Sequence, residues 1–347
     1  MKLKDWKLKG WKYYLQPLPQ KGGRFAEGNP LGMGRLGLLA SEMATFAYAA
    51  VTAVVILFTW TNIPDAASLL FLRLQYLAGT IGLWVVGLLW SCRLMMLARV
   101  CYLLAMLGTW YPDTYAINSQ FGSLDHVFAG MDQQLFGMQP SLIFSQAFPS
   151  AVVSELMCAG YFSYYLFFIV TLVLIFFRHF AMFERASFIV FAGFYICYVV
   201  YLFLPVTGPQ YYYLAAGLDN IAHGTFPDVG HYFRDHQECL AIPGWEGGLF
   251  HHLVQAAHQA GERPTAAFPS SHVAISTLVM AIATRLKMWR WLLALAIPYC
   301  FLCLSTVYIY AHYAVDAMAG FVFGLLLFFA LGGMKLKDTQ EWTSKLS

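Results

Sequence analysis

Long runs of apolar residues alternate with short polar segments along most of this chain. A helix that crosses a lipid bilayer needs about 20 mostly apolar residues, and eight segments come near that length. These predicted spans are residues 36–60, 69–91, 94–111, 157–177, 186–205, 272–286, 290–308 and 312–333. Because every backbone polar group must be satisfied inside lipid, we expect helices and not open sheets. The pattern predicts an all-α integral membrane protein, a helical bundle of about eight transmembrane helices.

Lysine and arginine gather on one side of these spans. They are frequent before the first span, in the short links after the second, fourth and sixth spans, and after the last span. The other side holds two long loops, 112–156, which has neither residue type, and 206–271, which has only Arg234 and Arg263. Cytoplasmic loops carry an excess of basic residues. We therefore predict that the N and C termini are cytoplasmic and that both long loops face outward.

Composition agrees with lipid as the solvent and argues against nucleic acid as a partner. Hydrophobic residues make up 59% of the chain and charged residues 11%, whereas soluble domains carry about 25% charged residues. The net charge is only +3, and no basic stripe, RNA-binding signature or zinc-finger spacing occurs. We expect membrane lipids, and no nucleic acid, as partners.

A first cluster of polar residues precedes the sixth predicted span. It reads Phe268-Pro269-Ser270-Ser271-His272, and either serine can cap the helix that follows. The N-terminus of a helix offers unpaired amide groups and a partial positive charge, which suits a phosphate. His272 would open this helix at the outward face.

A second cluster lies where the eighth span begins. His312 and Asp316 are four residues apart, so they share one face of a helix. The aspartate can accept a proton from one imidazole nitrogen and leave the other free to attack. A lone histidine at a membrane interface is more often a satisfied polar residue, but ionisable groups near membrane depth are costly and usually functional. We therefore predict that His272, His312 and Asp316 are catalytic.

These two clusters resemble the second and third signatures of the type 2 phosphatidic acid phosphatase superfamily, P-S-G-H and S-R-x5-H-x3-D. In that family the third-signature histidine attacks phosphorus, its aspartate orients it, and the second-signature histidine protonates the leaving oxygen. By position these roles fall on His312, Asp316 and His272. The resemblance implies an enzyme that forms a phosphohistidine and uses no metal or other cofactor.

The departures from these signatures point to one branch. Thr306 replaces the usual arginine and Ser271 the glycine, and the first signature, K-x6-R-P, is missing, because Ala256 stands where Arg263-Pro264 would need its lysine. The strings that resemble the fungal inositol phosphorylceramide synthase branch are Ser305-Thr306-x-Tyr308, His312-Tyr313-x-Val315-Asp316 and Ala267-Phe268-Pro269-Ser270-x-His272, with weaker support from Asp132-x-x-Leu135-Phe136-Gly137 and Pro205-x-x-Gly208-Pro209.

This resemblance implies a lipid phosphotransferase. It would move a phosphorylated head group, such as phosphoinositol, from a phospholipid to the hydroxyl of a ceramide-like lipid. Residues expected to bind substrate are Ser270, Ser271, Arg263, Tyr308 and Tyr313. The outward pocket would lie between the fifth, sixth and eighth spans.

The resemblance also divides the chain. It covers residues 94–333 as a six-helix catalytic core, which includes both long outward loops. Residues 36–93 would form two accessory transmembrane helices, residues 1–35 a cytoplasmic or interfacial segment, and residues 334–347 a cytoplasmic tail. We expect a multi-pass protein of the bacterial plasma membrane with its active site on the extracytoplasmic face.

Two other functions remain open. A lipid phosphate phosphatase, of the phosphatidic acid or polyprenyl phosphate type, would use the same residues with water as the acceptor. A lipid transporter or scaffold would need a polar path through the bundle, and the sequence indicates no charged residues in the inner half of the spans to line one. Zinc is not expected either, because the spacings of the loop histidines do not place them together; these are His223, His231, His236, His251, His252 and His258.

Overall fold

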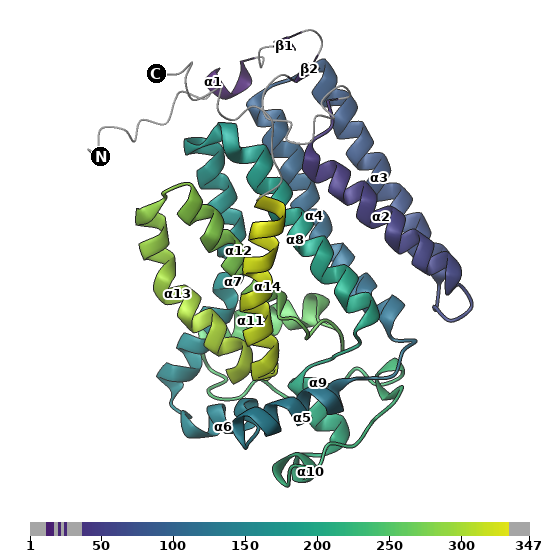
Figure 1. Cartoon of the computed structure of the whole chain (residues 1–347), viewed down its shortest axis with the longest axis vertical. Helices are drawn as coiled ribbons and strands as arrows, with labels where there is room; N and C mark the ends of the chain where they lie inside the picture. The colour runs from purple at the N-terminus through teal and green to yellow at the C-terminus, as the bar shows by residue number, and fades with distance from the viewer. Residues whose placement is uncertain (1–11, 17–19, 22–23, 26–36, 333–347) are drawn as a thin grey trace.

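The computed structural model describes residues 12–16, 20–21, 24–25 and 37–332, and these are chiefly helical (Figure 1). The long helices are α2 (Ala40–Phe58), α3 (Ala66–Leu89), α4 (Arg93–Asn118), α7 (Ala151–Arg178), α8 (Phe183–Phe203), α12 (Ser271–Arg285), α13 (Trp289–Tyr308) and α14 (Ala314–Gly332). The shorter ones are α1 (Lys12–Leu15), α5 (Asp125–Phe136), α6 (Pro140–Ala147), α9 (Pro209–Ala216), α10 (Leu218–Ala222), α11 (Leu249–Gly261) and the 3₁₀ helices η3 (Phe180–Met182) and η4 (Tyr232–Arg234). Two strands of two residues, β1 (Gln20–Lys21) and β2 (Arg24–Phe25), pair antiparallel.

Every predicted span corresponds to a long helix, but the count of eight is not confirmed. Within the described ranges, seven helices are long and apolar enough to cross a membrane. The predicted sixth span is α12, whose 15 residues extend about 22 Å, short of the hydrocarbon core. The protein is thus a multi-pass helical membrane protein. The predicted segments 1–35 and 334–347 lie mostly or wholly outside the described residues.

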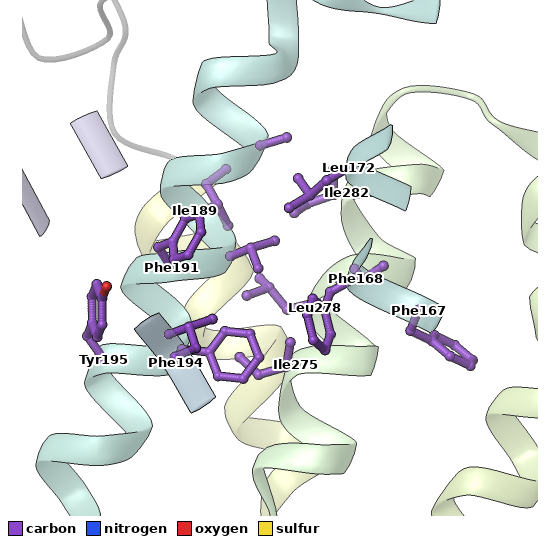
Figure 2. Packing of buried hydrophobic residues seen from close by; sticks show 14 of the residues in the cluster. Phe167, Phe168, Leu172, Ile189, Phe191, Phe194, Tyr195, Ile275, Leu278 and Ile282 are labelled. Atoms are coloured by element: carbon purple, nitrogen blue, oxygen red, sulfur yellow. The ribbon is translucent and has the colours of Figure 1, made fainter. Parts of the chain in front are cut away.

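The core of the bundle lies where α7, α8 and α12 meet (Figure 2). Phe168 of α7, Phe194 of α8 and Leu278 of α12 are among its buried members. Helix α12 packs against α7, α8, α13 and α14, which explains why so short an apolar helix is stable: its neighbours cover nearly all of its surface.

The outer surface of the bundle is apolar, as contact with lipid requires. Helix α3 packs chiefly against α2 and α4. Its exposed side chains include Phe71, Leu74, Ile81, Val85, Val86, Leu88 and Leu89. An apolar surface of this length on a soluble protein would be an aggregation site, whereas in a bilayer it is the ordinary lipid-facing side of a helix.

Charged residues do occur inside the bundle, so the sequence-based statement that the inner halves of the spans lack them is wrong. Arg99 of α4 donates to Glu42 of α2 (Nε to Oε1, 2.7 Å), and Glu184 of α8 accepts from the first amide of α2 (3.0 Å). A second ion pair joins Arg73 of α3 to Asp113 of α4 (3.1 Å). A single sequence does not reveal these partners, because each pair spans two helices. Both pairs tie the two N-terminal helices to α4, and paired charges of this kind are the form in which ionisable groups persist within a membrane.

The two long loops fold into short helices at one end of the bundle. Helices α5, α6, α9 and α10 lie there, at the end where α13 connects to α14, whereas α1 lies at the opposite end (Figure 1). The predicted outward loops are therefore ordered caps. Their placement next to the α13–α14 link positions the residues of the second polar cluster.

Helices α12 and α14 approach each other through two glycines. A Cβ atom at Gly320 would lie 2.6 Å from the carbonyl oxygen of Ser270, and one at Gly324 would lie 2.4 Å from that of Ala274. Small residues four apart form the flat helix face on which two membrane helices pack closely. This contact sets the N-termini of α12 and α14 side by side.

We expect Gly324→Ala to destabilise the protein, because the added methyl group must push α14 away from α12. Overpacking of this kind costs about 1–3 kcal/mol. Gly82→Ala in α3 is the matched control, since a Cβ there would meet nothing within 4 Å. Thermal unfolding in detergent measures the difference. Equal melting temperatures for the two variants would contradict the proposed packing role of Gly324.

Candidate active site

His312 lies in the link between α13 and α14, and it is almost fully buried, with 4% of its surface exposed. Its backbone amide donates to the carbonyl of Thr306 (2.9 Å). Thr306 is therefore part of the turn that holds His312, and its own hydroxyl donates to the carbonyl of Cys303 (2.9 Å). The residue at the position of the family's arginine thus contributes structure and not charge.

The hydrogen bonds of His312 define its tautomer. Its Nδ1 atom lies 2.8 Å from the carbonyl oxygen of Ala267. A carbonyl can only accept, so Nδ1 carries the proton and donates it. The Nε2 atom is left with a lone pair, which is the condition for a nucleophile.

His272 lies opposite this lone pair. Its Nδ1 atom is 3.5 Å from Nε2 of His312. Two tyrosines of α7 hold the ring: Tyr161 stacks on it with ring centroids 4.5 Å apart, and Tyr164 contacts it at 4.3 Å. The sequence had placed the pocket between the fifth, sixth and eighth spans, whereas the fourth span, α7, supplies these two rings.

Asp316 is completely buried at the start of α14. Its Oδ2 atom accepts the backbone amide of Tyr313 (2.9 Å) and lies 3.8 Å from Nδ1 of His312. The carbonyl of Ala267 is thus nearer to the imidazole than the carboxylate is. Asp316 stands in ion-pair range, where it would stabilise a positive charge on His312 without being the resting acceptor of its proton.

Burial keeps His312 neutral. Desolvation lowers the pKa of its imidazole to about 4, although the hydrogen bond to Ala267 opposes this shift. A folded-state pKa below the ordinary value means that the neutral form predominates throughout the physiological pH range. The lone pair on Nε2 is therefore available without prior removal of a proton.

A carboxylate of α5 caps the helix that bears Asp316. The two oxygens of Asp132 accept the backbone amides of Ala314 and Val315, each at 2.9 Å. The first amides of a helix have no partner inside that helix, and an acidic group favours the positive end of the dipole. Asp132 thereby fixes the position at which α14 begins, two residues after His312.

Asp125, on the same helix, holds the other side of this link. It accepts the amides of Thr207 (2.9 Å) and Gly208 (2.9 Å) and the hydroxyl of Tyr313 (3.1 Å). Gly208 has φ of +95°, and a Cβ there would lie 2.6 Å from the carbonyl of Ala311. Only glycine permits this approach. Burial raises the pKa of Asp125, against the effect of its hydrogen bonds.

The structure places the residues predicted to bind substrate in different surroundings. Ser270 caps α12, with its hydroxyl accepting the amide of Val273 (3.4 Å), and Ser271 lies beside Tyr164 and Tyr201. The hydroxyls of Tyr308 and Tyr313 donate to Phe148 and Asp125. Both tyrosines are fully buried, so their hydroxyls act within the protein. Arg263 is partly exposed, and its guanidinium donates to the carbonyl of Glu262 (2.8 Å).

The loop histidines do not assemble. His236 stacks on Tyr232, and His223 bonds to the carbonyl of Asp219. The ring of His258 contacts Tyr161, the tyrosine that stacks on His272. Within residues 37–332 and the described N-terminal pieces, no three His, Cys, Asp or Glu side chains converge as metal ligands would.

Sequence reasoning missed four positioning groups: Asp125, Tyr161, Tyr164 and the carbonyl of Ala267. Some signal existed, because Asp125 and Asp132 are seven apart in a loop that lacks basic partners, and Tyr161 and Tyr164 share one helix face. No sequence signal indicates the carbonyl of Ala267, because every residue has a backbone carbonyl.

A sequence model of the PAP2 superfamily matches residues 126–330, which is more than half of the 347-residue chain. No curated protein and no solved structure matches the chain. His272, His312 and Asp316 all lie within the matched range. Members of the superfamily are generally phosphatases or phosphotransferases, so membership supports an enzyme of that class. The chain belongs to the PAP2 superfamily.

Proposed function

We propose that this protein is a membrane phosphotransferase that moves a phosphorylated head group from a phospholipid to the hydroxyl of a ceramide-like lipid. The observation that carries the proposal is the lone pair on Nε2 of a buried, neutral His312, 3.5 Å from Nδ1 of His272. A nucleophile and a proton carrier thus meet at one point. Family membership supports phosphoryl chemistry there.

In the first half-reaction, Nε2 of His312 attacks the phosphorus of the donor phosphodiester. The bond from phosphorus to the diacylglycerol oxygen breaks, and that oxygen takes a proton from His272, which enters this step as the imidazolium and leaves it neutral. Forming the nitrogen–phosphorus bond makes the His312 ring cationic. Asp316 at 3.8 Å and the carbonyl of Ala267 stabilise that charge in surroundings where few water dipoles compete.

In the second half-reaction, His272 takes the proton of the acceptor hydroxyl. The oxygen attacks phosphorus, the nitrogen–phosphorus bond breaks, and His312 returns to its neutral form. Proton transfer by His272 in each direction contributes roughly 10²- to 10⁴-fold. Hydrolysis differs only in that water replaces the acceptor.

The surroundings of the pair favour transfer over hydrolysis. Tyr161 and Tyr164 cover His272, and in the described part of the chain neither catalytic histidine is hydrogen-bonded to lysine or arginine. A dianionic phosphomonoester needs such cations more than a monoanionic diester does. Apolar walls also limit access of water, which a transferase must exclude.

We further propose that the site faces outward in a bacterial plasma membrane. Cys239 is exposed in the loop 206–271, so a membrane-impermeant maleimide should label it in intact cells, and Cys239→Ser should remove that signal. In the Cys239→Ser background, an introduced Ala181→Cys, at an exposed position of η3, should react only after permeabilisation. The reverse pattern would invert the topology.

We expect His312→Ala to abolish turnover and to abolish the covalent intermediate. In the wild type, a donor labelled in its head-group phosphate should leave label on the protein that is stable to base and lost in acid. Asp316→Asn should retain the fold and lower the rate strongly, because the cationic intermediate loses its counter-charge. Substantial activity in His312→Ala, or label that survives this substitution, would contradict the proposed mechanism, in which His312 is the nucleophile.

The choice between transferase and hydrolase depends on which oxygen reaches phosphorus first. Water is always present, but a bound hydroxyl held in line can act with an effective molarity of about 10⁵ M or more. Purified enzyme given a glycerophospholipid donor and a ceramide-like acceptor should therefore form the head-group-phosphorylated acceptor as its main product. Quick cleavage of phosphatidic acid, with no effect of acceptor on donor consumption, would identify a lipid phosphatase instead.

A further inference from the structure

Helix α7 is long enough to cross both headgroup layers of a bilayer. Its 28 residues extend about 42 Å, and a bilayer with its headgroups is roughly 40–45 Å thick. The helix begins at Ala151, directly after the cap helices α5 and α6. Its first turns therefore lie at headgroup depth in the leaflet next to the caps, which we call the cap-side leaflet.

One face of α7 is apolar and exposed near both ends of the helix. Val152, with 70% of its surface exposed, and Leu156 begin this face, and Leu166 and Phe177 continue it. Their spacings place all four residues on the same side of the helix. Within a bilayer such a side faces lipid. The lipid-facing side of α7 thus continues up to the depth of the headgroups.

The loop before α11 is tied to the first two turns of α7. The hydroxyl of Ser154 accepts the amide of Trp245 (2.9 Å), and the carboxylate of Glu155 accepts the amide of Phe250 (2.7 Å). Because these bonds join the backbone of the loop to α7, the loop lies at the same depth as the start of that helix.

Two glycines permit this close approach. A Cβ atom at Gly244 would collide with the side chain of Ser154, and one at Gly248 would collide with that of Glu155. Gly244 also has φ of +101°, a conformation that favours glycine. The loop is therefore held in contact with α7, and its exposed side chains have a fixed position.

Two of the exposed side chains in this loop are large and apolar. Trp245 has 48% of its surface exposed and Leu249 has 67%. Tryptophan is enriched at the depth of the headgroups, where one end of its ring system contacts acyl chains and the other meets polar groups. Glu246, between them, is exposed as well, and the polar headgroup layer accommodates it. Apolar side chains held in exposed positions mark a contact surface.

From this arrangement we infer that Val152, Leu156, Trp245 and Leu249 form a membrane anchor, which inserts into the cap-side leaflet. The partner is phospholipid, because the anchor continues the lipid-facing side of α7 and lies at headgroup depth. Insertion holds the start of α11 in the leaflet surface, and α11 packs against the helix that contacts His272. This inference goes beyond the proposed reaction and does not depend on it.

The test asks whether acyl chains reach the anchor. Leu249 is replaced by the photoreactive residue p-benzoylphenylalanine in the full chain, and the protein is placed in vesicles of phosphatidylethanolamine and phosphatidylglycerol. The lipids carry a radioactive label in their acyl chains, which the proposed reaction does not transfer to the protein. The same replacement at Leu166, on the exposed face of α7, is the positive control. Ala222, exposed in α10 at the far end of the caps (Figure 1), is the negative control.

After irradiation we expect lipid label at position 249 within about twofold of that at 166 and about tenfold above that at 222, because acyl chains surround an inserted side chain and not a water-facing one. Label at 249 no higher than at 222 would overturn the inference and place the loop in water. A crosslinked product of twice the mass of the chain would also overturn it, because the surface would then bind a second copy of the protein.

The three positions are compared as label per molecule of protein recovered in the vesicles, so differences in yield do not affect the result. All three are exposed in the structure, and the replacement therefore displaces no buried neighbour.

Discussion

The site depends on the close packing of α12 against α14. Gly320 and Gly324 allow the two backbones to approach so closely that a single methyl group at either position would collide with a carbonyl oxygen. The amide of Ser270, just before α12, then donates to the carbonyl of Asp316 (3.1 Å). His272 and His312 belong to the two chain segments joined at this point, so their 3.5 Å separation follows from the helix contact. In a membrane such packing is held by van der Waals contact and hydrogen bonds and not by the hydrophobic effect, which makes small residues at the interface indispensable.

Two carboxylates of α5 then fix the position of the link between α13 and α14 that carries His312. Asp132 accepts the amide of Ala314 at the start of α14. Asp125 accepts the amide of Gly208 and the hydroxyl of Tyr313, and so joins the segment around Gly208 to the link. Each of these carboxylates bonds to backbone amides instead of to lysine or arginine. A free carboxylate would repel a phosphate, but both of these carboxylates are satisfied by hydrogen bonds within the protein.

The surroundings of His272 and His312 explain how a PAP2 superfamily member can work without the cations of the family's usual signatures. The tautomer of His312 is set by a backbone carbonyl, its charge state by burial, and the orientation of His272 by two tyrosine rings. None of these three features adds positive charge to the site. A site of this kind stabilises a monoanionic diester at lower electrostatic cost than a dianionic monoester, and this is the physical basis on which transfer of an intact head group is proposed.

The sequence by itself determined the helical membrane class, the approximate bounds of the long helices and the family, because apolar runs and short motifs are local signals that survive without partners. It also indicated His272, His312 and Asp316 as a group, from their spacing and from their places at helix ends. Only the tertiary structure decided that α12 is a short central helix, that Glu42, Arg99, Arg73 and Asp113 are buried in pairs, and that the carbonyl of Ala267 rather than Asp316 accepts the hydrogen bond from Nδ1 of His312. Each of these features joins residues far apart in the chain. A contact between distant segments produces no periodicity or motif spacing in a single sequence, so the sequence alone cannot predict it.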